Sequence, residues 1–257
     1  MANKKSKSQT LVTKFPDEGE IFKATVQKHA ALIFFVHFYK GHKKALRRHI
    51  QFVNDLGYDA YAFNLKDDVS DHYGVPYSHI SKKFGMKHAM ADQIEEHLDL
   101  LSAYKEKVMF AFSNVAGCAI EVMGRRDNQG IKALICDSGP TANFVNSAYK
   151  LYKYAQPIKF APLRLVAAPL LAYGWSSELH KDIPKDLQKL PDGFPVLSIR
   201  GWKDPLMVPA EIDKIFEPCT NLAWQKLSLP EATHLTGLRD FPEDYKPAVE
   251  SFLNSAL

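Results

Sequence analysis

The sequence predicts an α/β fold, a doubly wound and mostly parallel sheet with helices on both faces. Runs such as ALIFFVHF, residues 31–38, are apolar without alternation, which is typical of a strand covered on both sides. Segments such as KKALRRHIQFVNDLG, residues 43–57, carry apolar side chains at helical spacing and end at a glycine. The two kinds of segment alternate along most of the chain, as in successive β-α-β units with right-handed crossovers.

The individual elements follow from this periodicity and from glycine and proline stops. TLVTKF and EIFKATV alternate enough to form a strand pair, expected as an antiparallel edge. The expected strands are residues 10–15, 20–26, 31–38, 58–65, 107–112, 132–137, 194–201 and 223–229. The expected helices are residues 43–57, 91–104, 116–126, 209–217 and 244–256. A polar connection up to residue 87 and an insertion over residues 141–190 interrupt the alternation.

Length and composition indicate one globular domain. The chain has 257 residues, 46% hydrophobic and 24% charged, so we expect a disordered basic tail (1–8) and a single domain (9–257). A net charge of +4 with dispersed basic residues argues against a nucleic-acid partner. The strongest apolar run, AALIFFV, is too short for an integral membrane segment. Three cysteines without metal-like spacing favour a reducing, cytoplasmic location.

Three reactive side chains follow three of the expected strands. Ser113 follows KVMFAF, Asp204 follows FPVLSIRG, and His234 follows AWQKLSL. The carboxyl ends of the strands form the ligand-binding edge of such a sheet, so these residues are expected to converge. A serine becomes nucleophilic when a histidine takes its proton and a carboxylate stabilises the imidazolium. The pattern therefore predicts a serine nucleophile with its base and acid.

Four stretches resemble the α/β-hydrolase fold superfamily, from about residue 10 to the end of the chain. FFVHFYKG resembles the strand ending in HGxxG, AFSNVAGCAIE the nucleophile elbow, PVLSIRGWKDPLMVP the acid loop, and THLTGLRDFPEDYKPAVESFL the histidine loop and closing helix. The order Ser, Asp, His is also that of the superfamily. The resemblance implies that Ser113 is the nucleophile, Asp204 the acid and His234 the general base. It implies an oxyanion hole of the backbone N–H groups of Tyr39 and Asn114.

Three positions depart from the superfamily's motifs. The glycines that flank the nucleophile in G-x-S-x-G are Ala111 and Val115 here, and the glycine of the HG pair is Phe38. A competing register places Val115 at the nucleophile position and Gly117 at the second glycine, which would make the protein a catalytically dead relative. We expect Ser113 in the turn, because this register keeps an apolar helix face at helical spacing. The residues of that face are Ala116, Ala119, Ile120 and Met123.

Other polar residues near the strand ends have alternative interpretations. Asp137, which ends the strand of residues 132–137, is an alternative acid, and Asp204 is alternatively a cap of the following helix. His37 is expected to orient the oxyanion loop. Cys118 is expected to be a buried structural thiol.

The expected reaction is cofactor-independent hydrolysis of a small-molecule carboxylic ester or thioester through an acyl-enzyme. The insertion is rich in aromatic and apolar residues, and the resemblance implies that it forms a cap over the site, so a hydrophobic acyl group is expected. The sequence has no phosphate-binding glycine loop and no metal-ligand spacing, so neither a cofactor nor a metal is expected. The alternative is a binding or regulatory protein that keeps the fold and pocket without turnover.

Overall fold

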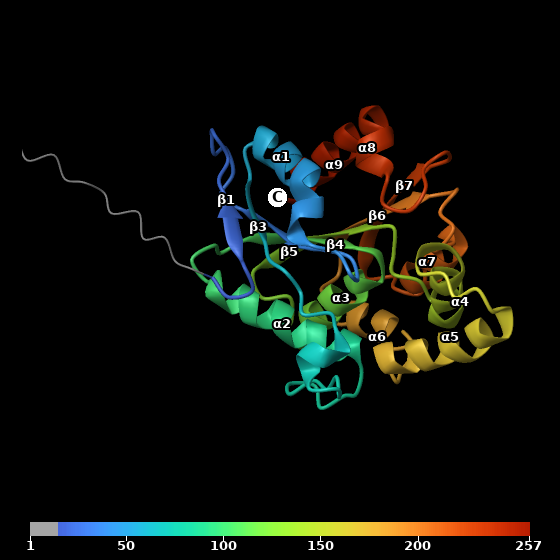
Figure 1. Ribbon diagram of the computed structural model, residues 1–257. Coiled ribbons are helices and arrows are strands. Elements are labelled where there is room, and N and C mark those ends of the chain that lie inside the picture. The colour runs from blue at the N-terminus through green and yellow to red at the C-terminus, as the bar shows by residue number, and fades with distance from the viewer. Residues whose placement is uncertain (1–14) are drawn as a thin grey trace, which may run out of the picture.

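The computed structural model describes residues 15–257, and its centre is a seven-stranded sheet (Figure 1). The strand order is β1-β3-β2-β4-β5-β6-β7. The strands are β1 (Glu20–Phe22), β2 (Leu32–Val36), β3 (Asp59–Ala62), β4 (Lys107–Phe112), β5 (Ile131–Asp137), β6 (Phe194–Gly201) and β7 (Leu222–Leu229). β1 is antiparallel to β3, and the other six strands run parallel. The predicted doubly wound sheet with an antiparallel edge is confirmed.

Helices cover both faces of the sheet (Figure 1). One face carries α1 (Arg47–Leu56), α8 (Gly237–Asp240) and α9 (Pro242–Ala256). The other carries α2 (Met86–Leu100), α3 (Ala116–Arg125), α6 (Ile183–Leu187) and α7 (Pro209–Phe216). The insertion contributes α4 (Phe144–Lys150), a π-helical turn (Leu151–Ala155), α5 (Ala161–Trp175) and α6. No helix of residues 15–257 is long and apolar enough to cross a bilayer.

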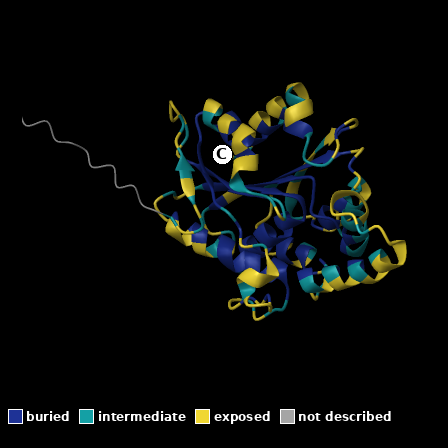
Figure 2. Ribbon diagram, viewed as in Figure 1, coloured by how far each residue is buried: buried dark blue, intermediate teal, exposed yellow. Residues whose placement is uncertain are grey.

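The core consists of two apolar layers, one on each side of the sheet. Successive side chains of a strand point to opposite faces, so β2 contributes Phe34 to the layer under α2 and α3, and Phe35 to the layer under α1 and α9. Every residue of β2 is fully buried, which is why the strand reads as an unbroken apolar run. Figure 2 shows the buried strands between helices whose outer faces are exposed.

The N-terminal strand pair is the first difference from the sequence-based expectation. Residues 1–14, which include the expected basic tail and most of the strand of residues 10–15, lie outside the described residues. β1 pairs with β3 and ends at Phe22, four residues earlier than predicted. The Asp59 carboxylate accepts hydrogen bonds from the Ala24 N–H (3.0 Å) and from Lys23 Nζ (2.7 Å). The Asp59 side chain therefore takes the hydrogen bond of the Ala24 N–H, which is no longer available to extend the strand.

The helix expected at residues 91–104 begins earlier, at Met86, and ends at Leu100. Its first turn contains Lys87 and His88, two polar residues before the expected helix that are fully buried. Lys87 forms an ion pair with Glu121 of α3 at 3.0 Å, and His88 Nδ1 forms a hydrogen bond with the same carboxylate at 2.7 Å. A polar side chain can be buried when it has a partner inside the protein. Hydropathy does not detect such partners, so the helix start was predicted too late in the sequence.

The connections place the candidate site. The chain runs from β2 outward to β3 and then returns to the other side of β2 to form β4. The loops after β2 and β4 therefore leave the sheet in opposite directions, and a crevice opens at their carboxyl ends. The loops after β5, β6 and β7 begin at the same edge of the sheet.

Candidate active site

Ser113 forms the turn between β4 and α3. Phe112 before it is extended, with φ −119° and ψ 141°, whereas Ser113 has a left-handed φ of 55° and begins a 3-10 turn (Ser113–Val115) that leads into α3. A positive φ is uncommon for a residue other than glycine and marks a locally constrained backbone. The turn exchanges strand for helix at one residue, the geometry of a nucleophile elbow.

Val115 adopts an ordinary right-handed conformation, with φ −67° and ψ −18°. Its side chain is fully buried in the core layer under α3, as is that of Ala111 in β4. Ser113 occupies the turn, and the competing register, with Val115 at that position, is wrong. The apolar face expected of α3 is also fully buried.

A glycine next to the turn is supplied by the loop after the neighbouring strand. Gly139 lies in the loop after β5, and a Cβ atom added there would come 2.5 Å from the carbonyl oxygen of Ser113. The close backbone approach at the elbow therefore depends on Gly139 rather than on residues 111 and 115. This role of Gly139 was not predicted from the sequence, where its signal is a glycine two residues beyond the expected strand of residues 132–137.

His234 and Asp204 meet at the ends of β7 and β6. His234 Nδ1 donates a hydrogen bond to Asp204 Oδ2 at 2.6 Å, which leaves Nε2 free to accept a proton. Asp204 Oδ1 accepts the N–H groups of Leu206 (2.7 Å) and Met207 (2.9 Å), so both carboxylate oxygens are held. The N-cap of α7 is Val208. Asp204 therefore does not cap that helix.

Asp137, the alternative acid, has different partners. Its carboxylate accepts hydrogen bonds from the Tyr245 hydroxyl and the Ser138 hydroxyl, each at 2.8 Å. Burial raises the pKa of Asp137 above its usual value. Ser138 Oγ also accepts the N–H of Leu235, at 3.2 Å, so Asp137 supports the loop that carries His234. No hydrogen bond within residues 15–257 joins Asp137 to His234 itself.

The loop after β2 is held by His37. Leu65 N–H donates to His37 Nε2 at 2.9 Å, so Nδ1 carries the proton and donates to the Phe38 carbonyl at 2.8 Å. Burial lowers the pKa of His37, which favours this neutral form. Gly41 closes the loop, because its N–H donates to the same carbonyl at 2.8 Å and a Cβ there would lie 2.6 Å from it.

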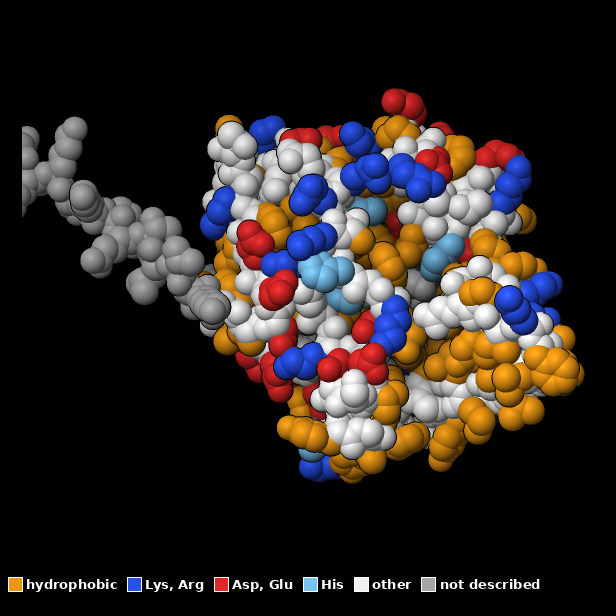
Figure 3. Space-filling view, in the orientation of Figure 1, with side chains coloured by type: hydrophobic (Ala, Val, Ile, Leu, Met, Phe, Trp, Pro, Cys, Tyr) orange, Lys and Arg blue, Asp and Glu red, His pale blue; other side chains and the backbone are white. Residues whose placement is uncertain are grey.

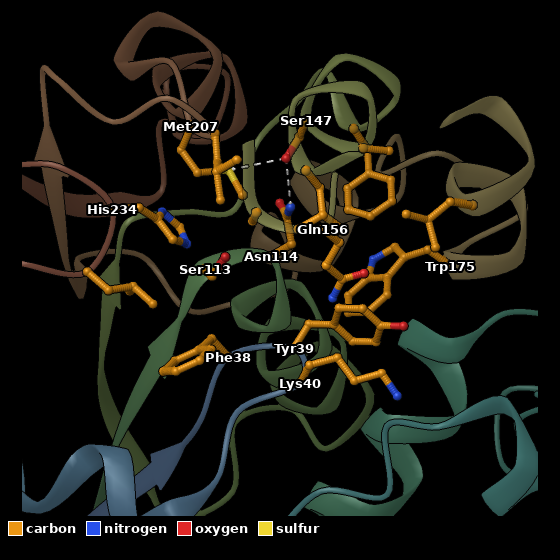
Figure 4. A pocket seen from close by; sticks show the side chains of 17 residues that line it. Phe38, Tyr39, Lys40, Ser113, Asn114, Ser147, Gln156, Trp175, Met207 and His234 are labelled. Carbon is orange, nitrogen blue, oxygen red and sulfur yellow. Dashed lines mark hydrogen bonds between the residues drawn. The ribbon is translucent and has the colours of Figure 1, made fainter. Parts of the chain in front are cut away.

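These loops surround one cavity of about 290 Å³ (Figure 4). Ser113 and His234 both line it, and Figure 4 shows the imidazole pointing toward the serine. Tyr39 and Asn114 also line the cavity, and Phe38, the departure from the HG motif, forms part of its wall. Among the residues that the structure describes, no acceptor is found for the Tyr39 N–H, and Asn114 is in the first turn of a helix, where N–H groups lack helical partners.

The insertion supplies the opposite wall of the cavity. Trp175 of α5 contacts Tyr39 edge to face, with ring centroids 5.5 Å apart. Trp175 Nε1 donates to His180 Nε2 at 2.8 Å, and His180 Nδ1 donates to the Thr141 carbonyl at 2.8 Å. Burial lowers the pKa of His180 to about 4, so the ring is neutral near pH 7. Neutral contacts therefore attach this part of the insertion to the loops of the site.

The side chain of Asn114 joins the turn to the insertion. Its Nδ2 donates to Ser147 Oγ of α4, and its Oδ1 accepts the N–H of Thr141, each at 3.2 Å. Only the backbone of Asn114 was predicted to belong to the site. The partners of the Asn114 side chain lie about thirty residues further along the chain, so the local sequence pattern could not predict these contacts.

One group of residues in the described chain has the spacing of metal ligands. His88, Glu178 and Asp182 each place a ligand atom within 4.8 Å of the others. Lys87 Nζ already pairs with Asp182 and, at 3.0 Å, with Glu121. The chain thus supplies its own cation at this position.

The buried thiol of Cys118 lies in α3, and burial raises its pKa well above the usual range.

Comparison with known proteins identifies the fold. No protein-family model matches the chain, and no curated protein matches it. A structure of an esterase from Pyrococcus furiosus matches with a TM-score of 0.66 and 18% identity, over 93% of this chain and 87% of that chain. A thermostable carboxyl esterase from Bacillus coagulans matches with a TM-score of 0.68 and 14% identity, over 93% and 94%. An α/β hydrolase from a deep-sea metagenome of the Medee basin matches with a TM-score of 0.62 and 14% identity, over 92% and 93%. The chain has the α/β-hydrolase fold.

Proposed function

We propose that the protein is a serine hydrolase that cleaves carboxylic esters or thioesters with a hydrophobic acyl group. The observation that carries the proposal is the left-handed turn at Ser113, in the same cavity as a histidine whose Nδ1 is bonded to a buried carboxylate. The esterases with the same fold support the class of reaction. The apolar walls of the cavity, including Phe38, Leu171 and Trp175, favour an apolar acyl group. The three cysteines are free and buried, which supports a cytoplasmic location.

In the proposed reaction, His234 Nε2 takes the proton of Ser113 Oγ as the oxygen attacks the carbonyl carbon. Asp204 accepts the Nδ1–H and stabilises the imidazolium. The N–H groups of Tyr39 and Asn114 donate to the oxyanion. His234 then returns the proton to the departing alkoxide or thiolate, and a water activated by the same imidazole releases the acid from the acyl-enzyme.

A fluorophosphonate probe tests this proposal directly. We expect one adduct, located by mass spectrometry on Ser113, and no adduct in Ser113→Ala or His234→Ala. Ser147→Ala is the matched control, because Ser147 is another serine in the cavity wall, and its adduct should remain on Ser113. A folded protein that takes up no probe and hydrolyses no p-nitrophenyl ester would instead support the binding-protein alternative.

Gly139→Ala is expected to lower kcat/KM for a p-nitrophenyl ester by about 100-fold. The added Cβ would lie 2.5 Å from the Ser113 carbonyl oxygen, so the turn must move. Gly174→Ala is the control, because a Cβ there meets nothing within 4 Å. If Gly139→Ala retained full activity, the turn would not depend on this close approach.

A further inference from the structure

α5 and the residue before it expose many apolar side chains. We call the side chains of Phe160, Leu163, Leu165, Val166, Leu170 and Tyr173 the α5 face; each is at least 51% exposed. The C-terminal half of the helix packs inward through Ala168, Ala172 and Trp175. Figure 3 shows hydrophobic side chains gathered over the region where α5 runs in Figure 1. A contiguous exposed apolar surface marks an interaction site more often than scattered apolar residues do.

The segment around the α5 face carries only positive charge. Residues 138–177 contain Lys150, Lys153, Lys159 and Arg164 and no Asp, Glu or His. The remaining 29 Lys and Arg of the chain balance its 29 Asp and Glu, so the net charge of +4 equals the charge of this segment. Within residues 15–257, none of the four cations lies within salt-bridge distance of a carboxylate. Lys153 instead lies over the ring of Tyr154, 4.8 Å from its centroid.

We propose that the α5 face docks on the surface of an anionic lipid bilayer. Apolar and aromatic side chains enter the boundary between headgroups and acyl chains, while neighbouring lysines and arginine meet anionic headgroups. A second copy of this chain fits less well, because a symmetric contact would bring two sets of unpaired cations together. An anionic bilayer offers an apolar layer to the α5 face and negative headgroups to the neighbouring cations.

The docked orientation places the candidate active site close to the bilayer. Leu171 and Trp175 line the cavity from the inner side of α5, whereas Leu170 next to them is 68% exposed on its outer side. The helix that would lie on the lipid is thus also a wall of the cavity. Docking does not depend on the proposed hydrolysis, so Ser113→Ala is expected to bind lipid as the wild type does.

Vesicle co-sedimentation of the full chain tests the proposal. We expect binding to vesicles of phosphatidylcholine with phosphatidylserine to be at least about tenfold tighter than to phosphatidylcholine alone, and to weaken as salt is added. The double variant Leu165→Asp, Leu170→Asp should lose at least about tenfold of this binding, because the charge enters the apolar boundary. The double variant Lys153→Glu, Lys159→Glu should lose the preference for phosphatidylserine.

The matched control is Val26→Asp with Val75→Asp, which places the same charges at valines that are 65% and 61% exposed and lie outside the α5 face. Its binding should equal that of the wild type. Failure of the wild type to bind either vesicle would overturn the proposal, as would binding that the α5-face variant leaves unchanged. Analytical ultracentrifugation adds a further outcome: a dimer that Leu165→Asp dissociates would assign the α5 face to a second copy instead.

Discussion

Asp204→Asn is expected to lower kcat for ester hydrolysis by about 10⁴-fold while the protein stays folded. The amide retains an oxygen for the N–H groups of Leu206 and Met207, so the loop after β6 keeps its hydrogen bonds. It presents an NH₂ group to His234 Nδ1, however, which favours the tautomer with the proton on Nε2. That nitrogen can then no longer accept the proton of Ser113. Steady-state kinetics with a p-nitrophenyl ester, together with thermal unfolding, measures both effects.

Asp137→Asn is the matched control for this result. Asp137 is a second buried carboxylate at the same sheet edge, bonded to Tyr245 and Ser138 rather than to His234. We expect Asp137→Asn to reduce kcat by less than about tenfold, because it would displace the loop that carries His234 only slightly. The assignment of Asp204 as the acid would be rejected if the two variants exchanged these effects. Full activity of Asp204→Asn would reject the proton relay as a whole.

Lys87→Met is expected to lower the free energy of unfolding by about 3–5 kcal/mol. Lys87 is fully buried and pairs with Glu121 of α3 and with Asp182 just before α6. Burial disfavours its charge, but the two carboxylates outweigh this and hold the pKa of Lys87 above its usual value. Removal of the ammonium leaves these carboxylates without that partner in a dry environment. Urea unfolding measures the change.

The surface pair of Lys214 and Glu211 provides the control. Lys214→Met removes a contact of similar length, 2.7 Å, but the lysine is 61% exposed, so we expect a loss below about 1 kcal/mol. Equal effects of Lys87→Met and Lys214→Met would show that burial of the ion pair does not determine its contribution.

The destabilisation by Lys87→Met is also expected to depend on pH. Burial works to raise the pKa of Glu121, but the hydrogen bond with His88 and the charges of Lys87 and Arg125 hold it well below its usual value. A depressed folded-state pKa gives stability that is present above the usual glutamate pKa of about 4.3 and is lost as the pH falls through the folded-state value. Without Lys87, Glu121 takes up its proton more readily. The difference in unfolding free energy between wild type and Lys87→Met should therefore narrow as the pH falls below about 4.3, and a difference that stays constant there would contradict this account.

Most of the fold could be predicted from local periodicity. β2 and β4 are buried on both faces, so each appears as an unbroken apolar run, and α3 and α9 show apolar side chains at helical spacing. The start of α2 and the helices of the insertion could not be predicted in this way. Lys87 and His88 are buried as partners of Glu121, which is more than thirty residues away along the chain. The outer side of α5 is apolar although it is exposed, so hydropathy does not distinguish its inner side from its outer side.

By itself, the sequence determined the fold class and the placement of Ser113, Asp204 and His234 after β4, β6 and β7, because a strand end is encoded locally and the carboxyl ends of parallel strands share one edge. Only the tertiary structure decided that His234 bonds to Asp204 and not to Asp137, and that Gly139 takes over the role of the missing elbow glycines. The first depends on a 2.6 Å contact between the loops after β6 and β7, and the second on a backbone approach that leaves no room for a Cβ atom at residue 139. The spacing of residues along one strand carries no information about such contacts.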